Sequence, residues 1–200
     1  MAERVDHSSR KRDIALKATR LFSQVGYENV TPCQVAETAG VARTILYRYF
    51  KDKREVLDAA IRANTEGLLE ACLALAADAR KPAVFRLKAV CSCIADALYE
   101  RHDFLVAVYD FVLTMVRHGE NMNGRIVRFT RGTRKLFRRL VAEGVADGSL
   151  APTVNRARAC AILFGLLELC ASRITLGVEK DAVAARRRFN DYIDLISVRP

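Results

Sequence analysis

The stretch TPCQVAETAGVARTILYRYFKDK, residues 31–53, decides the fold of the N-terminal part of this chain. Thr31 is a favourable N-cap residue, and Pro32 suits the first position of a helix. Gly40 marks the point where the backbone takes a left-handed or open conformation. We therefore predict two short helices joined by a tight turn.

Each of the two predicted helices has a small apolar face. Val35, Ala36 and Ala39 form this face in the first helix, and Leu46 and Phe50, four residues apart, form it in the second. Because both faces are apolar, the two helices are expected to pack against each other.

The opposite face of the second helix is polar. It carries residues at positions i, i+1, i+4 and i+5, which are Arg43, Thr44, Tyr47 and Arg48. An arginine can bind guanine O6 and N7 with two hydrogen bonds, and tyrosine and threonine hydroxyls suit phosphate oxygens or base edges. This face is therefore suited to the major groove of DNA.

The segment resembles the DNA-binding domain of the TetR family of transcriptional regulators. That family has a threonine opening its second helix, then an A-x-x-A-G-V turn and an L-Y-x-Y-F-x-x-K motif. The matching residues are Thr31, Ala36, Ala39, Gly40, Val41, Leu46, Tyr47, Tyr49, Phe50 and Lys53. Two positions depart from the pattern: the family often has serine at Ala42 and glycine near Thr44. Ala42 cannot supply a side-chain cap to the recognition helix.

The predicted DNA contacts follow from the polar face and from the resemblance. The residues expected to contact bases are Arg43, Thr44 and Arg48. Those expected to contact phosphates are Thr31, Tyr47, Tyr49 and Lys53. Tyr49 has an alternative role, since its ring could pack on the first helix.

Composition agrees with a nucleic-acid partner. The 200 residues are 51% hydrophobic, the formal net charge is +10 and the sequence pI is about 9.6. Basicity alone does not distinguish nucleic acid from an anionic membrane surface, but the helix-turn-helix favours double-stranded DNA. No N-terminal apolar segment suggests a secretory signal, and no apolar run reaches the roughly 20 residues that span a bilayer. We expect a soluble, cytoplasmic protein without a membrane association.

The predicted fold class is all-α, in two parts. Residues 1–54 form a three-helix helix-turn-helix DNA-binding domain with an N-terminal arm, and a long helix joins it to an all-helical effector-binding and dimerisation domain, residues 55–200. The arm either touches the minor groove, as the resemblance suggests, or is a solvated tail. The first helix is expected to begin at Ser8 or Ser9, and the long helix at Asp52, with Glu55 completing a capping box. Later helices are expected at 82–99, 103–116, 123–144, 153–175 and 181–198.

The helix predicted at 123–144 has one apolar and one basic side. The basic side carries Arg125, Arg128, Arg131, Arg134, Lys135, Arg138 and Arg139. It is either a solvated face or a contact for an anion, such as the phosphates of a coenzyme A thioester.

The resemblance implies a homodimer formed through the last two helices and a small-molecule effector bound in the C-terminal domain. We hypothesise an apolar cavity between the helices from 82 to 175, lined by Phe104, Tyr109, Phe111, Phe137, Phe164 and Glu168. Aromatic residues at helical spacing are also ordinary core residues. Glu168 lies in an apolar helix, so we expect it to be paired, for which Arg173 is suitable, or to have a raised pKa.

These features predict a ligand-responsive, sequence-specific transcriptional regulator. We expect a repressor that leaves a pseudo-palindromic operator when a small, largely apolar effector binds. An alternative is a DNA-binding scaffold that acts through a protein partner without a small ligand. An enzyme is not expected, because the sequence has no nucleophile elbow, phosphate loop or metal-ligand spacing.

Cysteine chemistry leaves one further alternative. The six cysteines are Cys33, Cys72, Cys91, Cys93, Cys160 and Cys170. Cys91 and Cys93 diverge by roughly 200° on a helix and cannot easily share one ion, so we expect no metal or other cofactor. The cysteines are either core residues or, in part, a thiol-based sensor built on a pair.

Overall fold

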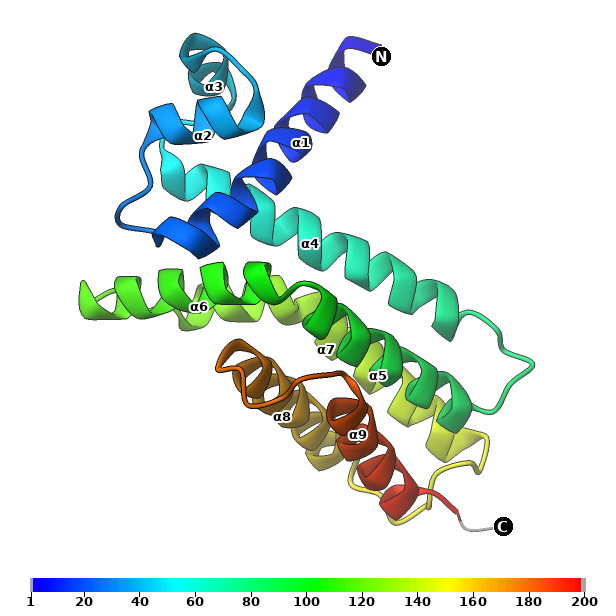
Figure 1. Ribbon diagram of the computed structural model, residues 1–200. Helices are drawn as coiled ribbons and strands as arrows, with labels where there is room; N and C mark the ends of the chain where they lie inside the picture. The colour runs from blue at the N-terminus through cyan, green and yellow to red at the C-terminus, as the bar shows by residue number, and fades with distance from the viewer. Residues whose placement is uncertain (1, 199–200) are drawn as a thin grey trace. The chain divides into compact units, whose positions relative to one another are not determined.

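The computed structural model describes residues 2–198, with side chains from His7 onward. Over this range it forms nine α-helices and no extended strand (Figure 1). They are α1 (Ala2–Val25), α2 (Pro32–Ala39), α3 (Arg43–Tyr49), α4 (Lys53–Ala76), α5 (Ala83–Glu100), α6 (His102–Arg117), α7 (Asn123–Ala146), α8 (Arg156–Thr175) and α9 (Val183–Ile196). The prediction of an all-α fold is confirmed. No helix of the described range is long and apolar enough to cross a membrane.

The chain divides into two compact units. Unit 1 contains the residues up to Glu66 together with Asp103–Phe129, and unit 2 contains Gly67–His102 and the residues from Thr130 on. Two long helices, α4 and α7, therefore contribute residues to both units. The domains predicted from the sequence, residues 1–54 and 55–200, were defined by expected function and not by contacts. That division stays a prediction.

The core of unit 1 joins the helix-turn-helix to α6. Ile14 and Phe22 of α1 are fully buried in the same cluster as Phe111 of α6. Tyr27 links them, since its ring centroid lies 6.1 Å from that of Phe22 and 4.8 Å from that of Phe111. The three N-terminal helices therefore share one apolar core with α6 and the start of α7.

Polar contacts reinforce this core. Asp110 of α6 accepts a hydrogen bond from the backbone amide of Tyr27, at 2.6 Å. Arg125 of α7 donates to both carboxylate oxygens of Asp58 in α4, at 2.7 and 2.8 Å. Arg54 pairs with Glu120 in the α6–α7 loop. Charge-assisted hydrogen bonds of this kind are stronger than neutral ones, so they fix α4 on the other elements of unit 1.

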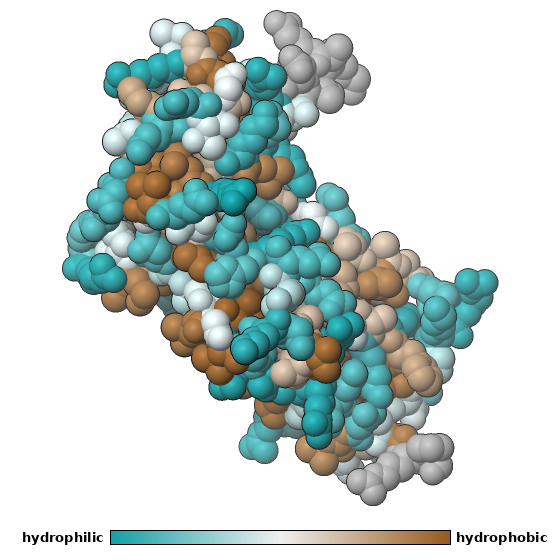
Figure 2. All heavy atoms as spheres, in the orientation of Figure 1, coloured by the Kyte–Doolittle hydropathy of each residue, from teal (hydrophilic) through white to brown (hydrophobic). Residues whose placement is uncertain are grey.

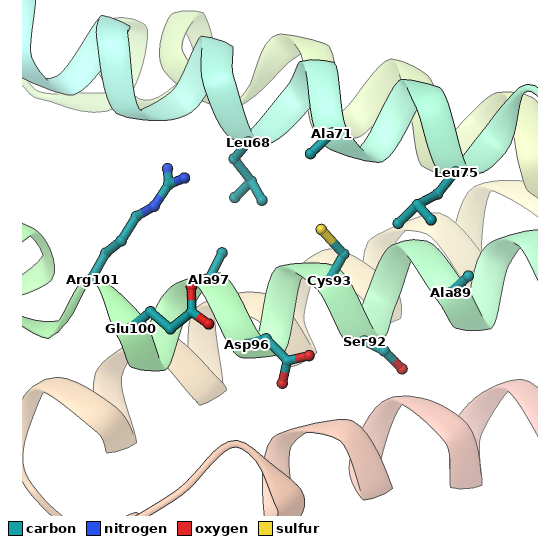
Figure 3. Close-up of a pocket in the computed structure, with 10 residues that line it drawn as sticks. All are labelled: Leu68, Ala71, Leu75, Ala89, Ser92, Cys93, Asp96, Ala97, Glu100 and Arg101. Atoms are coloured by element: carbon teal, nitrogen blue, oxygen red, sulfur yellow. The ribbon is translucent and has the colours of Figure 1, made fainter.

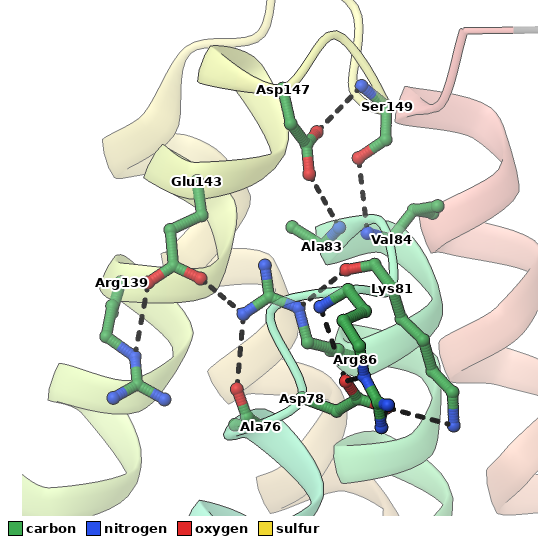
Figure 4. Close-up of polar contacts among 11 residues, drawn as sticks. Ala76, Asp78, Lys81, Ala83, Val84, Arg86, Arg139, Glu143, Asp147 and Ser149 are labelled. Carbon is green, nitrogen blue, oxygen red and sulfur yellow. Dashed lines mark hydrogen bonds and ion pairs between the residues drawn. The ribbon is translucent and has the colours of Figure 1, made fainter.

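Unit 2 is organised around α5, which packs against both α8 and α9. A buried arginine joins its first turns to neighbouring segments (Figure 4): the guanidinium of Arg86 donates to the carbonyls of Ala76 and Lys81, at 3.1 and 3.0 Å, and to Glu143 at 2.6 Å. The end of α4 and the loop that follows are thereby attached to α7.

Side chains from the α7–α8 loop cap α5. Pro82 at the N-cap makes no side-chain hydrogen bond. Instead, the amide of Ala83 donates to Asp147 at 2.7 Å, and that of Val84 donates to the Ser149 hydroxyl at 3.2 Å (Figure 4). Because the first amides of a helix have no partner within it, these contacts stabilise the start of α5.

Several predicted helix starts and caps differ in detail from the structure. The cap at Ser8 or Ser9 was wrong: α1 already begins at Ala2, because the residues before the serines are no barrier to a helix. Asp52 caps α4 as expected, because its carboxylate accepts a hydrogen bond from the Glu55 amide at 2.9 Å. The Glu55 carboxylate, however, accepts a hydrogen bond from the amide of Lys51 and not from that of Asp52. The helix predicted from 153 begins at Arg156, after the N-cap Asn155.

Candidate nucleic-acid interface and ligand groove

The turn between α2 and α3 is fixed by local contacts. The Thr31 hydroxyl accepts a hydrogen bond from the Gln34 amide at 3.3 Å, and the Gln34 side chain accepts one from the Thr31 amide at 2.9 Å. This capping box satisfies two amides at the start of α2. Gly40 ends α2 with φ 69° and ψ 38°, the left-handed conformation that glycine adopts without steric cost. The predicted helix-turn-helix geometry is present.

Helix α3 has one buried and one exposed side. Leu46 and Phe50, the residue after the helix, are each 2% exposed. Both belong to the hydrophobic core of unit 1 and hold α3 in place there. The opposite side presents four exposed residues, Arg43, Thr44, Tyr47 and Arg48. The structure thus brings together all the residues predicted for the polar face. Ala42 makes no side-chain cap, as expected from its methyl group.

Arg43 and Tyr47 lie together on this face. The Arg43 guanidinium donates to the Tyr47 hydroxyl at 3.5 Å and lies 5.6 Å from the centre of its ring. This hydrogen bond raises the pKa of Arg43 further above its ordinary value, so the side chain stays cationic at any physiological pH. The pair offers several donors at one exposed position, as base-edge or phosphate recognition requires.

The residues predicted to contact phosphate also have structural partners. The Tyr49 ring is half-buried, and its centroid lies 4.5 Å from that of the His7 ring on α1, which agrees with the alternative packing role. The Thr31 hydroxyl takes part in the cap of α2. Neither contact decides whether these residues also bind DNA.

Lys53 is tied to the loop between α1 and α2. Its ammonium donates to the carbonyls of Glu28 and Val30, at 2.5 and 3.1 Å, and lies 4.9 Å from the centre of the Tyr27 ring. Burial lowers the pKa of Lys53, and the nearby Glu28 opposes that effect. The sequence did not indicate this role, because the two carbonyls belong to residues more than twenty positions away.

Sequence reasoning also missed the contacts of the basic run at residues 10–12. The Lys11 ammonium lies 4.9 Å from the centre of the Phe50 ring, and the Arg12 guanidinium donates to the Ala63 carbonyl at 3.2 Å. Cation–π contacts and hydrogen bonds to buried carbonyls hold α1 in place. Part of the basic charge therefore has a structural role.

The six residues predicted to bind an effector do not meet in one unit. Three lie on α6 in unit 1, and three lie in unit 2. In unit 1, Phe104 and Tyr109 are half-buried, whereas Phe111 is fully buried between Tyr27 and Arg125, whose guanidinium lies 5.7 Å from its ring centre.

In unit 2, Phe137 is fully buried and the ring of Phe164 is covered by the Arg134 guanidinium, 3.4 Å from its centre. Glu168 is exposed. Arg173, suggested as its partner, binds Glu179 instead, at 2.6 Å. The assignment of these residues to an effector site stays a prediction.

Unit 2 contains a groove of about 480 Å³ between α4 and α5 (Figure 3). Its apolar lining consists of Leu68, Ala71, Leu75, Ala89 and Ala97, and its polar lining of Ser92, Cys93, Asp96, Glu100 and Arg101. This volume is within the range of small-molecule sites, roughly 300–1,000 Å³. The sequence did not single out this lining, because its residues come from two helices and form a groove only when the helices lie side by side.

Comparison with known proteins points to bacterial regulators. Residues 14–60 match the sequence profile of the bacterial regulatory proteins of the tetR family. The chain is similar to the HTH-type transcriptional regulator HbdR of Aromatoleum sp. (strain CIB), with 42% identity over 48 residues, 24% of this chain and 21% of that protein. It is also similar to BetI of Escherichia coli, with 35% identity over 66 residues, 33% of this chain and 34% of BetI. The matched segment thus spans only about a fifth to a third of these relatives.

Solved structures extend the likeness of the fold over most of the chain. A TetR transcription regulator from Haloarcula marismortui superposes with a TM-score of 0.77 at 17% identity, covering 96% of this chain and 100% of that one. FadR from Bacillus subtilis in complex with stearoyl-CoA has a TM-score of 0.73 at 19% identity, with 90% and 96% covered. KstR2 of Mycobacterium tuberculosis, a ketosteroid transcriptional regulator, has a TM-score of 0.68 at 16% identity, with 95% and 96% covered. At such identities the likeness establishes the fold.

Proposed function

Through residues 14–60 this chain belongs to the TetR family of bacterial regulatory proteins, and on that premise we propose that it is a cytoplasmic transcriptional repressor released from its operator by a small effector. The observation that carries the proposal is the exposed face of α3. Two arginines, a threonine and a tyrosine point to solvent there, while the other face of the helix is buried. Such a set of donors on the exposed face of the second helix of a helix-turn-helix supports contact with DNA in the major groove.

Homodimerisation through α8 and α9 is part of the proposal. Large hydrophobic side chains on these helices are exposed, including Ile162 (45%), Leu169 (43%) and Leu195 (75%). Figure 2 shows hydrophobic side chains at the surface over the region that α8 and α9 occupy in Figure 1. A twofold dimer would place two copies of α3 on successive half-sites of a pseudo-palindrome, about 34–36 Å apart.

The groove between α4 and α5 supports the small-effector mechanism over the scaffold alternative. A scaffold that acts only through a protein partner needs no cavity, whereas this groove combines apolar residues with residues that carry polar groups. By differential binding to two conformations, an effector held there would oppose DNA binding.

The first effector probe is stearoyl-CoA, because a protein of the same fold binds it. The basic face of α7 supports an anionic ligand, since Arg131, Lys135 and Arg138 are exposed. Stearoyl-CoA should reduce operator binding in a concentration-dependent way. If the reduction is weaker in a variant that carries Arg131→Ala, Lys135→Ala and Arg138→Ala, this face contacts the ligand. Equal sensitivity of both proteins would leave the face as a solvated one.

Selection of random DNA duplexes tests the proposed function. The full chain should enrich one inverted repeat, and an Arg43→Ala, Tyr47→Ala variant should enrich none. Arg43→Ala alone should cost about 1–3 kcal/mol on the selected site and relax the preference at one base position, because one bidentate contact is lost. Arg117→Ala, which removes an exposed arginine at the end of α6, is the matched control. An Arg43→Ala protein with unchanged sequence preference would refute the assignment of α3.

A further inference from the structure

Helix α8 carries a stripe of residues with a regular repeat. Three large apolar residues lie seven positions apart: Ile162 (45% exposed), Leu169 (43%) and Leu176 (76%), which directly follows the helix. Two small residues, Gly165 and Ser172, lie between them and are also seven positions apart. At 3.6 residues per turn, these five residues, the α8 stripe, fall within a sector of about 80°. Heptad spacing of this kind is typical of helices that pack along a common seam.

The packing of the single chain does not account for the glycine in this stripe. Gly165 is exposed and its φ is not positive. Among the described residues, a Cβ added there would meet no heavy atom within 4 Å outside its own helix backbone. By contrast, a Cβ at Gly132 or Gly144 of α7 would collide with Leu69 or Leu150. Glycine destabilises a helix interior relative to alanine, so the close approach of a second molecule would give Gly165 a role.

The other small residue of the stripe is also compatible with a covered surface. Ser172 is half-buried, and its hydroxyl donates a hydrogen bond to the carbonyl of Leu169 in the same helix, at 2.9 Å. A polar group can be covered at low cost when its hydrogen bond is already formed within the chain. An apolar side chain can therefore lie over Ser172 without leaving an unpaired donor.

We propose that the α8 stripe packs against the same stripe of a second copy of this chain, with the two helices antiparallel and the twofold axis level with the midpoint between Gly165 and Leu169. Leu169 then lies on the partner's Gly165, and Ile162 lies on the partner's Ser172. Because the contact is twofold, each of these pairs occurs twice. The proposal rests on the homodimer of the proposed function and assigns the register in which its two α8 helices meet.

The sizes of the side chains select this arrangement. Antiparallel helices place each large residue of the stripe opposite a small one, which lets the two surfaces interdigitate. Parallel helices would instead place Gly165 opposite the partner's Gly165 and leave a void. An antiparallel register shifted by seven residues would leave Ile162 or Leu176 beyond the end of the partner helix. In the proposed register Leu176 faces the partner's Arg158, an exposed residue whose aliphatic stem can cover it.

Sedimentation equilibrium of the full chain tests the proposal. Gly165→Leu should raise the dissociation constant of the dimer by about tenfold or more, because two leucines would compete for one space at two symmetry-related places. The helix content should not fall, since the space around Gly165 is open in the single chain. Gly124→Leu is the matched control, because Gly124 is also exposed and a Cβ there also meets no atom within 4 Å. It should dimerise like the unsubstituted chain.

A second substitution distinguishes this register from others. Leu169→Ala alone should weaken the dimer, but Leu169→Ala combined with Gly165→Leu should recover most of the lost affinity, because the large and the small residue have then exchanged places. Ile162→Ala combined with Gly165→Leu should give no such recovery. Ile162 lies three residues from Gly165 in its own chain, but it faces the partner's Ser172.

The outcomes separate this proposal from the proposed function. A dimer that tolerates Gly165→Leu, or one that is not recovered by adding Leu169→Ala, would overturn the register and leave the homodimer in place. Equal recovery with Ile162→Ala would also overturn it. An unsubstituted chain that stays monomeric at all concentrations would overturn the homodimer itself. Loss of the dimer in Gly165→Leu with recovery only by Leu169→Ala would establish the register.

Discussion

At the scale of single residues, several basic side chains of the helix-turn-helix have a partner within the fold. Lys53 donates to two loop carbonyls, Lys11 lies over a ring, and Arg43 lies beside Tyr47. Of these, Arg43 is exposed together with its partner. It is therefore the residue whose loss should change sequence preference without changing the fold.

Lys53 is expected to combine a structural role with its predicted phosphate contact. Lys53→Met keeps the apolar stem but removes the donors for the carbonyls of Glu28 and Val30, so the free energy of unfolding should fall by about 1–2 kcal/mol. If the ammonium also binds phosphate, all DNA sequences should be weakened alike and the salt slope should fall by about 0.9. Thermal unfolding and titrations at several salt concentrations measure the two effects.

Lys51→Met is the control for this substitution, because Lys51 is an exposed lysine two residues away. It should leave the unfolding free energy unchanged. A Lys53→Met protein that is as stable as the unsubstituted chain, with an unchanged salt slope, would exclude both roles.

At the scale of elements, α6 belongs to the same core as the helices of the helix-turn-helix. Phe111 of α6 is fully buried against Tyr27, and Asp110 binds the Tyr27 amide. Glu120, just after α6, pairs with Arg54 on α4. These contacts attach α6 to the loop that precedes α2 and to α4.

The Arg54–Glu120 contact should appear in the acid stability of the protein. The Arg54 guanidinium holds the pKa of Glu120 below its ordinary value of 4.5, with burial opposing the shift. A carboxyl whose pKa is lower in the folded state contributes stability above pH 4.5, and that stability is lost as the pH falls below 4.5 and through the folded pKa. Glu120→Gln should therefore lower the melting temperature above pH 4.5. The melting temperature of this variant should also depend less steeply on pH in the acid range.

Melting temperatures measured across the acid range check this expectation. Glu66→Gln, which removes an exposed carboxylate from the helix that carries Arg54, is the control and should keep the slope of the unsubstituted protein. The contact would have no part in acid stability if Glu120→Gln retained the full slope as well.

At the scale of the whole molecule, the proposed homodimer would account for the exposed apolar side chains of α8 and α9. It would also pair the one α3 helix of each chain with a second copy. One short α3 makes too few base contacts to specify a long operator, and a twofold dimer doubles them. Covering Ile162 and Leu195 against a second chain would also remove apolar surface from water.

If the proposed dimer forms through this surface, charge placed on it should break the dimer. Ile162→Glu and Leu195→Glu are expected to give monomers in sedimentation velocity, with unchanged helix content because both side chains are exposed in the single chain. Operator affinity should fall with dimerisation. Leu113→Glu, at an apolar position on α6 whose exposure (52%) lies between those of Ile162 and Leu195, should remain dimeric. Monomers from Leu113→Glu alone would place the interface elsewhere.

The sequence by itself determined the local structure. The capping residue Thr31, the left-handed Gly40 and the apolar spacing of Leu46 and Phe50 specified the helix-turn-helix, and its polar face was predicted residue by residue. Such features depend on positions three or four residues apart, so a linear pattern is sufficient to reveal them. The all-α class followed in the same way from the apolar spacing of the later helices.

Contacts between distant segments were decided only by the tertiary structure. The partners of Lys53, the sharing of one core by α1 and α6, and the pairing of Arg173 with Glu179 all join residues on different elements or in loops. The groove between α4 and α5 likewise depends on how two helices are placed beside each other. Helical periodicity shows which face of a helix is buried, but the identity of the neighbour depends on packing, which balances many weak contacts over the whole chain.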